Sequence, residues 1–330
     1  MADRARLSAE KLSSLDKRAG GRPKRPMKSS PRPLSVGWPL PPATERPAWR
    51  SDILPATSEM LRDVAACADL AATPSHQAFL AETYRESMSY FFVYSSNRIE
   101  HVGTQTYGET AAVLRGAAAA EGAGCAAQNA RALAETRQTK RALDDLLQEH
   151  AERSAEARAP NELLYVTASS VVQSHRTLMT GIFAPGAHGY RTGHAQTDTD
   201  TGLYYYLAPE RIAAALEDLA DRMNAIAAAA GAAPLSPAER FAYAAKWLYE
   251  FLSIHPFADG NGRCGRLWTA YLLLELLPFP VTILPTLRVP YIRAMENAHL
   301  ADIQAILVES AWTHMRNFLQ AAEAVGGATA

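Results

Sequence analysis

Residues 255–266 read HPFADGNGRCGR, a polar, glycine-rich loop between two apolar segments that both carry helix signals. The segment 236–254 opens with Ser-Pro-Ala-Glu, in which Ser can cap a helix, Pro can take its first position and Glu can complete a capping box. The segment 263–277 is apolar and helix-compatible until a proline follows it. The sequence therefore predicts a helix to about residue 254, a chemically rich loop, and a second helix that begins in the loop.

The loop combines groups suited to a phosphate-linked substrate. His255 can accept a proton near neutral pH, and Asp259 can hold Mg²⁺, which prefers hard oxygen ligands. The glycines of Gly-Asn-Gly at 260–262 let backbone N–H groups approach phosphate oxygens at a helix N-terminus, which favours anions. Arg263 and Arg266 lie three residues apart, and each can fork onto phosphate oxygens. Each residue alone is more often structural, but the combination predicts transfer of a phosphate-linked group.

The twelve residues match every fixed position of the pattern His-Pro-Phe-x-Asp/Glu-Gly-Asn-Gly-Arg-x-x-Arg, so the segment resembles the Fic (Fic/Doc) family. The resemblance implies an all-α Fic fold, a helical bundle with a small β-hairpin flap beside the active-site loop. It also implies a nucleotidyltransferase that uses Mg²⁺ or Mn²⁺ to move AMP from ATP to a Ser, Thr or Tyr hydroxyl of a target protein. Gly-Asn-Gly favours this reaction over the phosphorylation of the Doc branch, which carries Ala-Asn-Lys.

The resemblance also implies a role for each loop residue. His255 would be the general base, and Asp259 would hold the metal ion against the α- and β-phosphates. The implied nucleotide-binding residues are Gly260, Asn261 and Gly262 at the α-phosphate, Arg263 at the β-phosphate, Arg266 at the γ-phosphate, and Tyr291 and His299 as candidates for the adenine pocket. Cys264 fills a free position, where we expect inert packing; a thiol pKa lowered by the two arginines is the alternative.

Residues 95–100 resemble the inhibitory motif of the family, Ser/Thr-x-x-x-Glu-Gly/Asn, with Ser96 and Glu100 one helical turn apart. The resemblance implies that Glu100 pairs with Arg266, blocks the γ-phosphate and holds ATP in an unproductive pose. His101 stands where the family has Gly or Asn, which is a departure from the motif. The alternative is that Glu100 is an ordinary exposed residue at a helix end.

Residues 194–207 correspond to the family's hairpin flap, which holds the target backbone as an added strand. The pattern predicts a turn at 198–202 and a strand at 203–206. The residues expected to bind the target are Ala195, Gln196, Tyr204 and Tyr205. His175, on a preceding helical segment, is expected to be structural.

Composition and the resemblance together predict four parts in the chain. Residues 1–50 carry twelve Lys/Arg against four Asp/Glu and are rich in Pro, Ser and Gly, which predicts a disordered basic arm over 1–55. We expect N-terminal helices with the inhibitory helix at 56–160, the catalytic core at 161–325, and a disordered tail at 326–330.

The formal net charge of −1 argues against specific nucleic-acid binding, and the apolar segment 267–287 is broken by Glu and Pro, so no membrane span is expected. Three widely spaced cysteines imply no disulfide framework, and no signal peptide is recognisable. These features favour an intracellular location, either cytoplasmic or nuclear. Because many inhibited family members are dimers, a homodimer is a candidate state.

Three other functions stay open. The first is removal of AMP from a modified target, in which the family uses the inhibitory Glu to position water. The second is transfer from another nucleotide donor, because the loop reads phosphates and not bases. The third is a non-enzymatic adaptor that binds nucleotide or peptide, although the intact His255 and Asp259 argue against it.

Overall fold

The computed structural model describes residues 54–116, 126–156, 164–183, 188–199, 202–230 and 233–328. The predicted basic arm falls outside these ranges except for its last two residues. Within them the chain forms helices and one two-stranded antiparallel sheet, so the all-α prediction with a small hairpin is confirmed.

The helices, in chain order, are α2 (Thr57–Ala71), α3 (Pro74–Phe79), α4 (Arg85–Ile99), α5 (Tyr107–Leu114), α6 (Ala126–Glu156), α7 (Ala168–Met179), α8 (Ile212–Ala229), α9 (Pro237–Ile254), α10 (Asn261–Leu273), α11 (Arg288–Glu296) and α12 (Leu300–Ala328). The strands of the hairpin are β1 (Gln196–Thr199) and β2 (Gly202–Tyr205). Short turns of other helix types occupy Leu80–Tyr84, Pro209–Arg211 and Pro285–Leu287.

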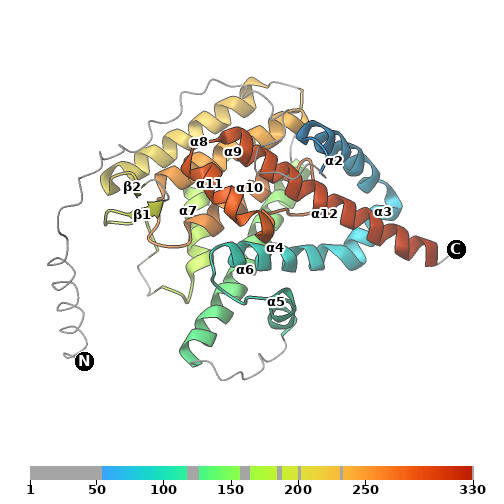
Figure 1. Cartoon of the computed structure of the whole chain (residues 1–330), viewed down its shortest axis with the longest axis horizontal. Helices are drawn as coiled ribbons and strands as arrows, with labels where there is room; N and C mark the ends of the chain where they lie inside the picture. Colours follow the sequence, from blue (N-terminus) through green and yellow to red (C-terminus); the bar gives the residue numbers. More distant parts are fainter. Residues whose placement is uncertain are drawn as a thin grey trace.

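Helix α9 lies beside α8, α10 and α12 (Figure 1) and has buried residues along nearly its whole length. One hydrophobic cluster packs α9 against α2 and α12, and a second packs it against α8 and α10. Helix α10 also contacts α4, α6 and α7, so the loop between α9 and α10 opens where several helices meet. Gly265 allows this packing, because a Cβ there would lie 3.0 Å from Phe251 and 3.1 Å from Leu248.

The predicted start of α9 is present in the structure. The Ser236 hydroxyl accepts the Glu239 N–H at 3.4 Å, and the Glu239 carboxylate accepts the Ser236 N–H at 2.9 Å. Helix α10, in contrast, ends at Leu273 rather than 277, and the chain continues in a turn closed by the bond from the Leu277 N–H to the Leu273 carbonyl. The proline at 278 disfavours helical geometry in the residue before it, so the helix does not resume after this turn.

The turn of the flap hairpin is shorter than the predicted turn at 198–202. Thr199 pairs with Gly202, and Asp198 pairs with Leu203, so part of the predicted turn belongs to the strands. Residues 200 and 201 lie outside the described ranges. The antiparallel pairing therefore continues as far as Thr199 and Gly202.

Two further features bear on the sequence-based expectations. Helix α12 continues to Ala328 and so enters the predicted tail at 326–330; no proline interrupts this segment, and its packed part can propagate the helix. Throughout the described ranges, none of the helices has the length and apolar character needed to cross a membrane.

Candidate functional site

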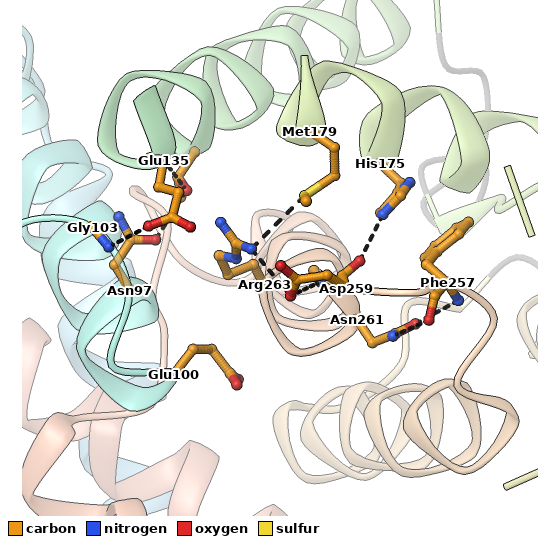
Figure 2. Close-up of polar contacts among 12 residues, drawn as sticks. Asn97, Glu100, Gly103, Glu135, His175, Met179, Phe257, Asp259, Asn261 and Arg263 are labelled. Atoms are coloured by element: carbon orange, nitrogen blue, oxygen red, sulfur yellow. Dashed lines mark hydrogen bonds and ion pairs between the residues drawn. The ribbon is translucent and has the colours of Figure 1, made fainter. Parts of the chain in front are cut away.

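The loop between α9 and α10 is closed by its own asparagine. Asn261 accepts the Phe257 N–H at 2.9 Å and donates to the Phe257 carbonyl at 2.8 Å, as Figure 2 shows. The side chain at 261 is thus committed to the loop backbone, and its contribution to a phosphate would come from its own N–H. The ring of Phe257 is buried and stacks on His175 with centroids 3.6 Å apart.

His175 supports the loop from α7. Its Nε2 donates to the Asp259 carbonyl at 2.9 Å, since a carbonyl can only accept. Burial is the main reason that the pKa of His175 falls to about 4, which keeps the ring neutral. The position agrees with the structural role expected for this residue.

His255 ends α9 in the left-handed conformation, with φ of 52°, and its ring stacks on Tyr206 at 3.9 Å. Burial, followed by the positive charge of Arg191, lowers the pKa of His255 to about 4, while the Leu252 backbone and nearby carboxylates act in the opposite direction. The imidazole is therefore neutral at physiological pH, the state in which it can accept a proton.

Arg191 joins the flap to the loop. Its guanidinium donates to the carbonyls of His255 at 2.7 Å and Gly193 at 2.8 Å and also to that of Leu207, and its backbone N–H donates to the Pro256 carbonyl. Sequence reasoning assigned no role to this residue. The sequence shows only one arginine in an ordinary polar segment. It does not indicate that this side chain binds carbonyls of both the flap and the loop.

The N-terminus of α10 is suited to bind an anion. Gly260 caps the helix with φ of 81° and without a side-chain cap, so the first N–H groups of α10 have no partner within the helix. A Cβ at 260 would also lie 2.9 Å from the Met179 sulfur, so both conformation and space require glycine there.

Arg263 and Arg266 are both buried beside this N-terminus but differ in their partners. Arg263 lies 3.5 Å from Asp259 and 3.8 Å from the Met179 sulfur, while its Nε and Nη1 have no hydrogen-bond partner among the described residues. Buried donors without partners are costly, so Arg263 is suited to bind an anionic ligand.

Arg266, in contrast, is fully engaged by the end of α4. Its Nη1 donates to Glu100 at 2.8 Å, its Nε to the Ser96 hydroxyl at 3.1 Å, and its Nη2 to the Ser96 carbonyl at 2.8 Å. Burial would raise the pKa of Glu100, but Arg266, followed by Arg263 and Arg288, lowers it below its usual value. The pairing implied for Ser96, Glu100 and Arg266 is thus present in the geometry.

Asp259 fits the expected metal-binding role. Its side chain is 40% exposed, and one oxygen accepts the Gly260 N–H at 2.6 Å, while the other lies 3.4 Å from Arg131. Mg²⁺ is commonly held by one or two carboxylates together with substrate phosphates. No group of three His, Cys, Asp or Glu residues gathers into a metal site within the described ranges, so a metal ion at Asp259 would depend on those phosphates.

The structure separates the two adenine-pocket candidates. Tyr291 is buried beside Arg266 and Glu100, at the arginine end of the site. His299 has a 64% exposed side chain and lies 3.6 Å from Asp302 on α12. Cys264 is fully buried, and burial raises the pKa of its thiol well above the usual value, so the alternative of a lowered pKa is wrong.

In the flap, Tyr204 and Tyr206 share one face and lie 5.0 Å apart, whereas Tyr205 is exposed on the other face. Tyr206, which sequence reasoning left out, is the residue against His255. The two-residue period of a strand was the signal that could have found it. Gln196 is exposed opposite Tyr205, and the Ala195 carbonyl accepts the Tyr206 N–H.

Comparison with known proteins gives the following matches. The model of the Fic/DOC family matches residues 165–273. A Fido domain-containing protein of Dictyostelium discoideum is 30% identical over 137 residues, which cover 38% of this chain and 90% of that protein. The protein adenylyltransferase fic-1 of Caenorhabditis briggsae is 29% identical over 140 residues, 42% of this chain but only 25% of the relative.

Among solved structures, a Fic domain-containing signaling protein from Bacteroides thetaiotaomicron superposes with a TM-score of 0.65. The two are 21% identical, and the match covers 80% of this chain and 97% of the other. At that identity the likeness concerns the fold.

Proposed function

Because the chain belongs to the Fic/DOC family, we propose that it is a protein adenylyltransferase that moves AMP from ATP to a Ser, Thr or Tyr hydroxyl of a target protein. The observation that supports this most is the short loop with a neutral His255 at one end and the buried, half-unpartnered Arg263 at the other. A base for a hydroxyl and a site for phosphates thus stand on one rigid loop.

In this proposal, His255 takes the proton from the target hydroxyl while that oxygen attacks the α-phosphorus. The new bond joins the target oxygen to phosphorus, the α–β phosphoanhydride bond breaks, and pyrophosphate leaves. The N–H groups at the start of α10 bind the α-phosphate, and Arg263 binds the β-phosphate. Asp259 would hold Mg²⁺, which neutralises phosphate charge when bound.

We further propose that Glu100 inhibits the reaction. Its carboxylate takes the arginine that would bind the γ-phosphate, and it lies where a Cβ at Gly262 would be only 2.0 Å from its oxygen. An anionic side chain thus stands over the anion site itself. The same position supports the second candidate function, removal of AMP, because a carboxylate there could orient a water molecule toward a bound phosphate.

The chemical test is label transfer from ATP to protein. We expect label from the α-phosphate of ATP in the protein after incubation of the Glu100→Gly variant with Mg²⁺, and none from the γ-phosphate. Label from the γ-phosphate would show phosphoryl transfer and contradict the proposal. Parallel reactions with α-labelled GTP, CTP and UTP determine the donor, and absence of label from all four would favour AMP removal or an adaptor.

A further inference from the structure

Helix α6 reaches the metal-binding carboxylate of the loop through Arg131. Its Nη2 lies 3.4 Å from Asp259, 128 residues further along the chain. The side chain of Arg131 is 55% exposed, so the pair is accessible to water. An ion pair of this kind is weak and can be exchanged for a stronger partner.

The guanidinium of Arg131 is oriented by a buried acid. Its Nε lies 2.9 Å from Glu135, whose side chain is only 4% exposed. The other oxygen of Glu135 accepts the Gly103 N–H at 2.8 Å, in the turn that follows Glu100 (Figure 2). The carboxylate at 135 is therefore fixed between α6 and this turn, and it fixes the direction of the arginine.

In the nucleotide-free protein, two arginines lie beside the Asp259 carboxylate. Arg263 lies on one carboxylate oxygen and Arg131 on the other. An arginine side chain keeps its positive charge at physiological pH. A Mg²⁺ ion at the same oxygen would repel a guanidinium 3.4 Å away, so the two cations would compete for this position.

We propose that Arg131 is a positioning residue of the metal site: it holds Asp259 in the nucleotide-free protein and competes with Mg²⁺ for the same carboxylate oxygen. This inference rests on the proposed metal role of Asp259. Arg131 keeps the acidic side chain oriented toward the anion site before the metal–nucleotide complex arrives, at the cost of weaker metal binding.

The test is direct metal binding without turnover. Mn²⁺ is titrated into the full chain carrying Glu100→Gly, with saturating α,β-methylene-ATP, and bound metal is followed by water-proton relaxation. We expect Arg131→Gln to lower the half-saturating Mn²⁺ concentration about twofold to fivefold, the size of a partly exposed ion pair. High salt should reduce this difference, because it screens the pair in the parent protein.

Two matched variants distinguish competition by the charge of Arg131 from the effect of losing any arginine of helix α6. Arg131→Lys keeps the positive charge and should stay near the parent value, while Arg137→Gln removes an exposed arginine of the same helix and should change nothing. An unchanged or weaker Mn²⁺ affinity in Arg131→Gln would overturn the inference. Undiminished Mn²⁺ binding in Asp259→Asn would overturn the proposed metal site itself, and the inference with it, which is a different result.

Discussion

The Glu100 carboxylate lies 2.8 Å from the Arg266 guanidinium, and the same oxygen stands directly over Gly262, where any Cβ would be 2.0 Å away. Arg266 is buried, whereas the Glu100 side chain is 38% exposed. The contact therefore places a solvent-accessible acid on a fixed, buried cation at the start of α10. Glu100 thus occupies the arginine that the inhibition proposal assigns to the γ-phosphate.

Removal of the acid should activate the protein. We expect Glu100→Gly to raise transfer of AMP to the protein itself by about tenfold or more, since a hydrogen bond between charged groups contributes about 1.5–3 kcal/mol. Glu100→Gln keeps the shape but loses the charge, so it should fall between the two. Initial rates at fixed Mg²⁺ and ATP measure the order, and equal rates in the three proteins would contradict inhibition by Glu100.

Loss of the Ser96 hydroxyl, which also binds Arg266, should activate the protein less than loss of Glu100. Ser96→Ala removes one acceptor at 3.1 Å but leaves the Ser96 carbonyl in place, so we expect activation of about twofold to fivefold. Ser95→Ala is the matched control, because Ser95 is equally buried and its hydroxyl has no hydrogen-bond partner among the described residues. Activation by the control as large as by Ser96→Ala would mean that general loosening of α4 is the cause.

The transfer activity should persist to a lower pH than an ordinary histidine base would allow. Burial lowers the pKa of His255 to about 4, so the neutral, proton-accepting form prevails above that pH. We expect the kcat of Glu100→Gly to be insensitive to this group from about pH 6 to 8 and to fall below about pH 5. Circular dichroism at each pH identifies unfolding. A rate that follows a group of pKa about 6.5, the ordinary histidine value, would contradict the assignment.

Acid should also destabilise the fold through His314. This side chain is buried against Phe91, and burial lowers its pKa to about 4. Below about pH 6.5 the unfolded chain binds a proton at His314, whereas the folded chain does so only near pH 4. The free energy of unfolding therefore decreases as the pH is lowered from about 6.5 to 4. We expect this loss to be about 2 kcal/mol smaller in His314→Leu between pH 6.5 and 4.5, by urea unfolding.

The loop between two helices was predictable because its signals are local. Residues 255–266 are contiguous, their helix signals lie immediately beside them, and the capping residues at 236–239 act within one turn. The pairing of Glu100 with Arg266 joins two distant segments, and only the resemblance to a family suggested it. The sequence could not suggest Arg131 or Glu135, because their contacts with the loop and with Gly103 arise from the packing of α6 against α4 and α10.

Two details of side-chain placement could not be read from the sequence. Tyr205 was expected to bind the target, and this stays a prediction; strand alternation exposes Tyr205 and turns Tyr206, which was not expected at the site, toward His255. His299 was grouped with Tyr291, yet it caps the start of a separate helix and is exposed there. Which of several neighbouring polar residues faces a site depends on register and helix phase, and these are fixed only by tertiary packing.

The measurement that tests the account most directly is the intact mass of the protein after incubation with Mg²⁺ and ATP. The wild type, Glu100→Gly and Glu100→Gly/His255→Ala are compared under the same conditions. The account predicts a mass gain of one AMP in Glu100→Gly, little in the wild type and none in the double variant. Equal AMP gain in Glu100→Gly and the double variant would contradict His255 as the base, and no gain in any of the three would contradict self-modification by AMP transfer.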